Sequence, residues 1–180
     1  QYGLTPKSHF RAAAIIRSMS YDNLTAHKTE SEIGWGVLAS ATFNVMNRLQ
    51  VYGQGVYGKG IGQFLNDMSL LNVDVVPNPE KEGKMQVLPM MGWFAGMQYN
   101  FSPKVFITST YGQSRLYSHD GYPTTPSEQY RYGQYLNATL FWNITSDLQV
   151  GAEYLRGWRT DFNGDTRHAN RMNLAVQYSF

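Results

Sequence analysis

The C-terminal stretch Met172-Asn-Leu-Ala-Val-Gln-Tyr-Ser-Phe180 decides the fold class, because large apolar residues occupy every second position in it. Met172, Leu174, Val176, Tyr178 and Phe180 share one side of this pattern. Small or polar residues fill the other side. Successive side chains of a β-strand point to opposite faces. A period of two therefore predicts a strand with one apolar face and one polar face.

The same alternation occurs in eight segments of the chain. They are residues 8–21, 32–45, 48–60, 86–101, 104–117, 129–144, 147–160 and 168–180. Short turns at 46–47, 102–103 and 145–147 alternate with longer loops at 22–31, 61–85, 118–128 and 161–167. This order is typical of membrane barrels with tight turns at one end and long loops at the other. The sequence predicts an all-β fold, a transmembrane antiparallel up-and-down β-barrel of about eight strands. No separate soluble domain is expected in residues 1–180.

Composition agrees with this fold class. Charged residues make up 16% of the chain, against about 25% in ordinary soluble domains. Aromatic residues make up 14%, and no apolar run approaches the ~18 residues of a membrane helix. A net charge of +2 argues against a nucleic-acid binder. The absence of cysteine excludes disulfides and thiol chemistry. A soluble eight-stranded lipocalin would reverse the two faces, with apolar residues inside. The terminal strand and the aromatic content favour the membrane barrel.

Charges separate by sign along the chain. Most carboxylates fall in loops or turns, whereas many arginines fall on the predicted strands, where Glu153 is the only carboxylate deep in a strand. A charge that faces lipid costs roughly 2–4 kcal/mol at the midplane. We therefore expect the strand arginines to face water inside the barrel. With Phe180 facing lipid, the lumen residues are predicted to be Arg11, Arg17, Arg48, Arg131, Glu153, Arg159 and Arg171. The same count puts Arg115 and Arg156 on the lipid side, which predicts that they lie at a rim or at a bulge.

A lumen lined by guanidinium groups attracts carboxylates and phosphates. The sequence therefore predicts a pathway that prefers anions. The alternative is that these arginines pair with loop carboxylates and hold loops inside the barrel. Both roles can hold for different residues.

Two segments leave their packing open. Residues 87–97 are apolar on both faces and include Pro89, so they pack inside against a loop or outside against a neighbouring subunit. We favour the subunit contact. In loop 61–85, the spacing of Phe64, Leu65, Met68 and Leu71 predicts a short helix. That helix either constricts the lumen or lies on the rim.

Neither catalysis nor a bound cofactor is expected. The four histidines are scattered, and His119-Asp120 has no visible partners for a catalytic set. The chain shows no ligand set with metal-binding spacing. The sequence predicts a protein that is not an enzyme and holds no metal.

Three groups of residues resemble the DcaP-like outer-membrane porins. The first is His9-Phe-Arg-Ala-Ala-Ala-Ile-Ile-Arg-Ser-Met-Ser-Tyr21, followed by Gly34-Trp-Gly-Val-Leu-Ala-Ser40. The second is Tyr154-Leu-Arg-Gly-Trp-Arg159 with Asn163-Gly-Asp. The third is Ala169-Asn-Arg followed by the terminal strand. Within these matching motifs, the resemblance implies that Arg11, Arg17, Arg159 and Arg171 correspond to the arginines that determine selectivity in that family.

The resemblance implies a sixteen-stranded homotrimeric channel in the outer membrane of Gram-negative bacteria. The eight strands here would be the C-terminal half of the barrel. The implied partners are outer-membrane lipid, lipopolysaccharide and small anionic solutes, dicarboxylates among them. We therefore expect a porin for passive diffusion of anions. The alternative is a complete eight-stranded outer-membrane barrel with a structural or adhesive role.

Overall fold

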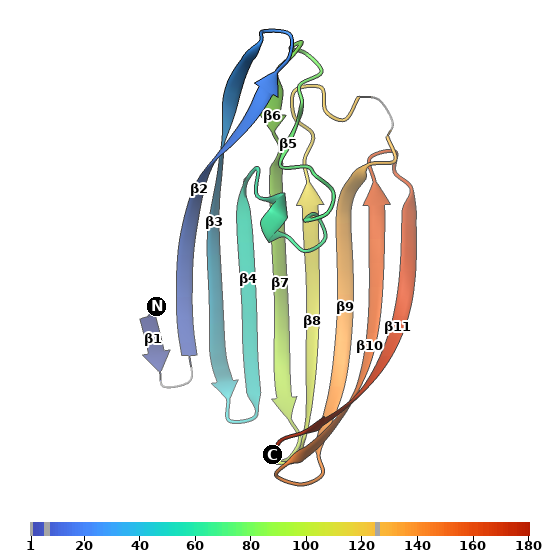
Figure 1. Cartoon of the computed structure of the whole chain (residues 1–180). Helices are drawn as coiled ribbons and strands as arrows, with labels where there is room; N and C mark the ends of the chain where they lie inside the picture. Colours follow the sequence, from blue (N-terminus) through green and yellow to red (C-terminus); the bar gives the residue numbers. More distant parts are fainter. Residues whose placement is uncertain (1, 6–7, 125–126) are drawn as a thin grey trace.

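The protein forms one large antiparallel sheet in a computed structural model that describes residues 2–5, 8–124 and 127–180 (Figure 1). The sheet has nine strands in the order β1-β2-β3-β4-β7-β8-β9-β10-β11, and β5 and β6 form a separate two-stranded sheet. The strands are β1 (Tyr2–Thr5), β2 (Ser8–Asn23), β3 (Lys28–Met46), β4 (Leu49–Lys59), β5 (Val75–Pro77), β6 (Met85–Val87), β7 (Pro89–Asn100), β8 (Val105–Leu116), β9 (Tyr130–Asn143), β10 (Leu148–Asp161) and β11 (Thr166–Tyr178). Every strand of the large sheet pairs with its neighbours along the chain, so the fold is an up-and-down meander. Its outermost strands, β1 and β11, do not pair with each other in the described residues, so the sheet is open.

All eight predicted strands are present, with shifted ends. β1 is a ninth strand that the sequence did not predict, because four residues are too few to establish a period of two. The predicted loop 22–31 shrinks to residues 24–27, because β2 and β3 pair as far as Asn23 and Lys28. This hairpin rises above the neighbouring strands in Figure 1. No helix in the described part of the chain is long and apolar enough to cross a membrane.

The sheet has two chemically different faces. We call the face on which residues 60–88 pack the covered face, and the other the open face. Across the sheet, the register places Gly36, Gly58, Met90 and Leu116 side by side on the covered face. The open face carries large exposed apolar side chains on the large-sheet strands β2, β3, β4, β7, β9, β10 and β11. Among them are Phe10, Ile16, Val37, Tyr57, Trp93, Leu140, Tyr154 and Leu174.

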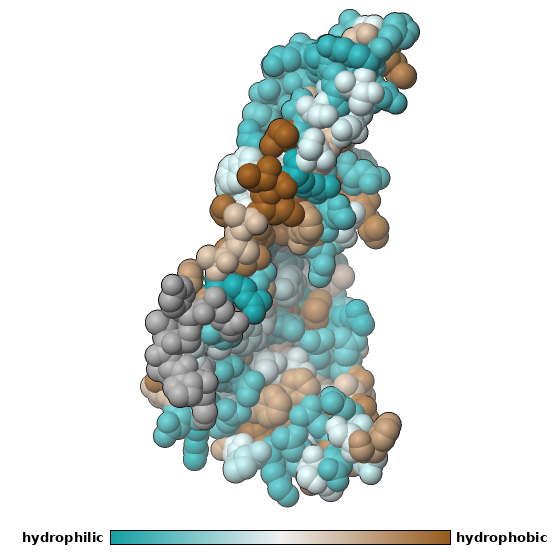
Figure 2. All heavy atoms as spheres, turned by 60° about the vertical axis from the view of Figure 1, so that its left-hand side comes forward, coloured by the Kyte–Doolittle hydropathy of each residue, from teal (hydrophilic) through white to brown (hydrophobic). Residues whose placement is uncertain are grey.

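The apolar side chains of the terminal strand β11 all lie on one face, as the alternation predicts, and that face is the open face. Leu174 and Val176 are 85% and 74% exposed. Figure 2 shows hydrophobic residues gathered at mid-height, with hydrophilic residues at the upper tip. An ordinary soluble domain rarely exposes so much contiguous apolar surface.

Among the described residues, the buried apolar core lies where residues 61–88 meet the covered face. It consists of Ile61, Leu65, Met68, Val73, Val76, Leu88, Met90, Leu116 and Tyr130. The inward alternative for the apolar segment 87–97 therefore holds for Leu88 and Met90, which are fully buried under the loop. Met91, Trp93 and Met97 lie on the open face, where the favoured subunit contact remains a prediction.

The prediction of a short helix in loop 61–85 was wrong. The structure has a single 3₁₀ turn, η1 (Gly62–Phe64), followed by irregular turns. Phe64 is 55% exposed, whereas Leu65 and Met68 are buried. Several residues here, such as Asn66, Asp67 and Asn72, are weak helix formers. Asn72 takes a left-handed backbone angle (φ 53°), which ends any helical repeat. The loop folds over the covered face of the sheet, and constriction of a lumen by this loop remains a prediction.

Gly58 tests how closely β3 and β4 approach each other. A Cβ atom added there would overlap the Trp35 carbonyl oxygen and lie 2.7 Å from Gly36 Cα. Since both neighbours are backbone atoms, we expect Gly58→Ala to lower the free energy of unfolding by about 1–3 kcal/mol. Urea unfolding of the refolded protein in detergent, followed by circular dichroism, measures this.

Gly55→Ala is the matched control, because a Cβ there meets only Trp93 Cβ at 4.0 Å. Equal stability of the two variants would contradict the close approach at Gly58.

Candidate functional site

Arg17 is the point at which the sheet holds its folded loop. It lies on β2 opposite Gly34, and the absence of a side chain at Gly34 leaves room for it. Its guanidinium donates to Asp74 Oδ2 at 2.9 Å, to the Gly60 carbonyl at 3.1 Å and to Gln63 Oε1 at 3.2 Å. Asp74 in turn accepts from the Gly62 and Gln63 amides. The Arg17 side chain thus connects β2 to both ends of the segment 60–74, through an ion pair with Asp74 and a hydrogen bond to Gly60.

A second clamp holds the middle of the loop to β8 and β9. The Ser114 hydroxyl donates to Asp67 Oδ2 and lies 2.5 Å from the Tyr130 hydroxyl. Tyr130 also donates to the Ser114 carbonyl at 3.0 Å. Tyr130 is 6% exposed, and Gly133 leaves room for its ring. The loop is therefore tied to two places on the covered face that lie far apart in the sheet.

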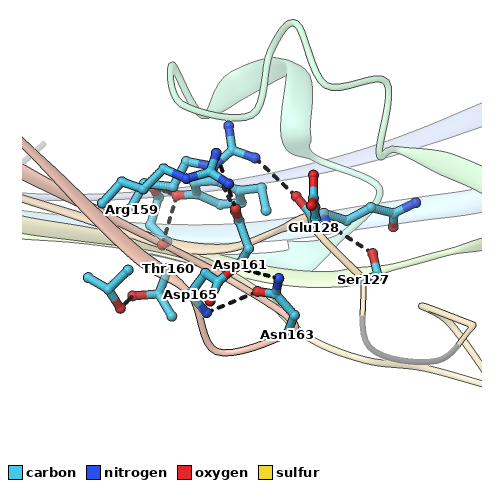
Figure 3. Close-up of polar contacts among 12 residues, drawn as sticks. Ser127, Glu128, Arg159, Thr160, Asp161, Asn163 and Asp165 are labelled. Carbon is cyan, nitrogen blue, oxygen red and sulfur yellow. Dashed lines mark hydrogen bonds and ion pairs between the residues drawn. The ribbon is translucent and has the colours of Figure 1, made fainter.

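Two arginines face each other across β10 and β11 beside this clamp. Arg159 and Arg167 are directly paired in the register. Arg159 Nε donates to Asp161 Oδ1 at 2.7 Å (Figure 3). Arg167 Nη1 lies 3.9 Å from Asp161 Oδ2. Asp161 is 1% exposed and turns inward at a bulge in the β9–β10 pairing. Two guanidinium groups thus share one carboxylate.

A cavity of about 420 Å³ opens between the loop and these strands. Asp67 lines it from the loop, and Tyr130, Tyr135, Arg159 and Arg167 line it from the sheet. Arg159 also lies over the Tyr130 ring, with Cζ 5.6 Å from the ring centroid. The cavity therefore combines two cationic groups, one loop carboxylate and tyrosine rings.

A polar network continues down the covered face. Glu153 accepts hydrogen bonds from Asn137, Thr139 and Asn173, at 2.7 to 3.2 Å. Arg171 donates to Asn173 Oδ1 at 2.8 Å and makes no ion pair with a described residue. Glu153 is therefore held by neutral donors.

The remaining predicted lumen residues are placed less uniformly. Arg11 lies on the covered face opposite Ser40, is exposed, and borders a second cavity of about 330 Å³. Arg48 lies in the two-residue turn between β3 and β4, so its expected place on a strand needs correction. The β4 strand begins one residue later, and alternation assigns Arg48 to neither face. Arg131 lies beside the β9 bulge, with Cζ 5.9 Å from the Tyr132 ring centroid on the open face. The parity that suggested a lumen position does not continue through that bulge.

Sequence reasoning missed Arg167, Asp67 and Tyr130. Arg167 shares the parity of Arg171, so starting the last strand two residues earlier would have found it. The partners of Asp67 lie 47 or more residues away, which no local pattern reveals. Among the described residues, no cluster of three or more His, Asp or Glu side chains could hold a metal ion.

Glu30 anchors the hairpin formed by β2 and β3 to Lys84, which directly precedes β6. It lies where β3 extends beyond the end of β4. Its carboxylate is 2.7 Å from Lys84 Nζ and 2.9 Å from Lys28 Nζ. The two ammonium groups, Lys84 first, lower the pKa of Glu30 from 4.5 to about 2. Tyr21 also donates to Glu30 and accepts from the Met85 amide. The hairpin tip and β6 are thus joined by charge.

The two faces and the folded loop define a class of structure. A sheet with apolar side chains outward and polar side chains inward is typical of membrane channels built from β-strands.

The comparison with solved structures agrees with this fold. The fold resembles the outer membrane channel DcaP of Acinetobacter baumannii, with a TM-score of 0.71 at 18% sequence identity. The match covers 99% of this chain and 60% of that channel's chain, so the protein spans less than two thirds of its length. No family model matches the chain, and no curated protein sequence does. The likeness is one of fold: antiparallel, all-β and built as an up-and-down meander.

Breaking the Arg17–Asp74 pair should release the loop. We expect Asp74→Asn to reduce the free energy of loop docking by about 1–3 kcal/mol, because the pair is charged and partly buried. Limited proteolysis should then cut residues 61–74 faster, while the circular dichroism of the sheet stays unchanged. Asp147→Asn, in an exposed turn with no ion pair among the described residues, is the control. Equal cleavage of both variants would show that the pair does not hold the loop.

The ion pairs of Glu30 with Lys84 and Lys28 should persist at a pH of about 3. A carboxylate whose pKa is lowered on folding contributes stability above its ordinary pKa of 4.5, and that contribution is lost as the pH falls towards about 2. We therefore expect pepsin at pH 3 to spare residues 78–84 in the unaltered protein and to cut them in Glu30→Gln. If both proteins are cut at the same rate at pH 3, Glu30 does not anchor the hairpin.

Proposed function

We propose that the chain forms part of the wall of an outer-membrane channel through which small anions diffuse passively. One observation supports this proposal most directly: the strands β10 and β11 place three arginines, Arg159, Arg167 and Arg171, on the covered face. Arg159 and Arg167 share Asp161, and Arg171 makes no direct ion pair with a described residue, although it acts on the Glu153 carboxylate through space. The proposal includes no catalytic step.

Different arginines have different roles in this proposal. Arg17 is neutralised by Asp74 and positions the loop, which is the structural role weighed from the sequence. Arg159, Arg167 and Arg171 face the cavity or the open space of the covered face and attract the solute. Guanidinium groups can hold a carboxylate by two parallel hydrogen bonds. Small carboxylates, dicarboxylates among them, are the solutes that this lining would favour.

The loop narrows the passage in this proposal. Residues 61–74 pack over β4, β7 and β8 on the covered face, as seen in Figure 1. A solute that crosses this level passes between Asp67 and the arginines of β10 and β11. Asp67 opposes anions there, so it moderates the preference that the arginines create.

We also propose that further strands close the barrel. The sheet is open, and the chain matches 60% of the length of a known channel chain. Strands from a longer polypeptide would supply the rest of the wall, as expected for the C-terminal half of a sixteen-stranded barrel. In a homotrimer, the open face of β7 with Met91, Trp93 and Met97 would contact a neighbouring subunit.

Ion selectivity tests the proposed pathway. A unit charge about 10 Å from an ion in water changes its free energy by about 0.4 kcal/mol, roughly a factor of two in local concentration. We expect the triple substitution Arg159→Gln, Arg167→Gln and Arg171→Gln to lower the anion-to-cation permeability ratio about two- to eightfold. Reversal potentials of the full-length protein in planar bilayers, under a potassium chloride gradient, measure this ratio. Asp67→Asn should raise it.

Arg156→Gln is the control, because Arg156 lies on the open face over Trp158. An unchanged ratio in the triple variant would contradict the arginine pathway. Absence of any conductance in correctly folded full-length protein would contradict the channel itself.

A further inference from the structure

Two arginines stand on the apolar open face, where the two strands β8 and β9 meet the loops. Arg115 is the second-last residue of β8, and its register partners are Met91 and Tyr132. Its Cζ lies 5.0 Å from the Tyr117 ring centroid and 5.9 Å from that of Tyr132. Arg131 Cζ lies 5.9 Å from the same Tyr132 ring. Two guanidinium groups therefore flank one tyrosine.

Arg115 and Arg131 are half-buried but lack the carboxylate partner that the half-buried Arg17 has. Neither makes an ion pair with a described residue, whereas Arg17 and Arg159 each pair with an aspartate. Arg115 Nε is buried and has no hydrogen-bond partner among the residues described. The carboxylate of the nearby loop, Asp120, lies 3.5 Å from His119 instead. Arg115 and Arg131 thus carry two positive charges that no described carboxylate pairs with.

The surrounding contacts hold the guanidinium groups in place. Tyr117 donates to Met91 Sδ at 3.0 Å, which fixes the ring beneath Arg115. Stacking uses the face of a guanidinium and leaves its N–H edge free to bind oxygen atoms. A third basic group is close, because Tyr117 pairs with Pro89, and Pro89 is the register partner of Lys59. Lys59 Nζ lies 3.4 Å from His119 Nε2.

The position of the pair selects the kind of anion. Apolar side chains cover the open face below it, so that face contacts hydrocarbon if the proposed function holds. A solute in the channel would pass on the opposite side of the sheet. The anions that meet this face at its loop end are lipid headgroups. A phosphate monoester carries more than one negative charge and three acceptor oxygens, which match two guanidinium forks.

We propose that Arg115 and Arg131 bind a phosphate group of a lipid in the leaflet around the loop end of the sheet. Tyr117 and Tyr132 orient the two guanidinium groups and border the acyl region. The inference rests on the proposed function, since it requires the open face to contact lipid. It names a lipid site that is separate from the solute pathway.

Lipid binding by the full-length protein in detergent tests the site. The probes are lipid A, which carries two phosphates, the same lipid with both phosphates removed, and inorganic phosphate. Native mass spectrometry measures the bound fraction of each. We expect lipid A to bind, and the double substitution Arg115→Gln and Arg131→Gln to weaken its binding by about tenfold or more. The dephosphorylated lipid should bind equally weakly to both proteins.

The matched control removes two charges from the covered face, with Arg11→Gln and Arg171→Gln, and should bind lipid A like the unaltered protein. Arg115→Lys with Arg131→Lys should bind with an intermediate affinity, because charge remains but the fork is lost. Undiminished binding of lipid A by the double glutamine variant would overturn the site. Equal binding of the dephosphorylated lipid, or of inorganic phosphate alone, would overturn the lipid phosphate as its ligand.

Channel conductance is measured on the same double glutamine variant. Normal conductance with lost lipid binding supports the site and the channel together. If the double variant loses lipid binding and none of the proteins conducts ions, the open face still contacts lipid as the site requires, and only the passage of solutes is rejected.

Discussion

The register of the strands is the constraint on which the rest of the structure depends. Side chains alternate along each strand, so a slip of one residue would move every apolar side chain of that strand to the polar face. The glycine contact between Gly36 and Gly58 brings β3 and β4 close at one level and fits only this register. As a consequence of this register, Arg17 on β2, Ser114 on β8 and Glu153 on β10 all lie on the covered face. Backbone hydrogen bonds within the sheet, rather than a central core, hold the strands, since the buried core lies only under the loop.

The loop links the architecture to the candidate site. Its core residues pack on Met90 and Leu116, and its polar residues meet Arg17 and Ser114. The same packing sets the position of Asp67 opposite the arginines of β10 and β11. The shape of the cavity is thus a consequence of how the loop is anchored. Arg17 and Arg159 illustrate the difference between an arginine that holds structure and one that remains beside open space.

Local patterns in the sequence are sufficient to predict the strands and most of their faces. The alternation located eight strands, and parity placed Arg11, Arg17, Arg159 and Arg171 on the covered face. It failed where the backbone departs from a regular strand, as at the Arg131 bulge and the Arg48 turn. It could not predict the loop, because the helical spacing of Leu65 and Met68 reflects burial against residues distant in the chain. The proposed closure into a barrel and the proposed solute depend on contacts beyond this sheet.

The loop contacts also set an order of assembly. Each strand of the sheet pairs with its neighbour in the chain, so hairpins can form one after another with short loop closures. The Arg17–Asp74 pair joins residues 57 positions apart, and the Asp67–Ser114 contact joins residues 47 apart. The first contact needs β2 in place and the second needs β8, so the loop makes both only when the two strands belong to one sheet. The loop therefore takes its final position only in a sheet that already spans β2 to β8, and the cavity beside it has its shape only in that assembled sheet.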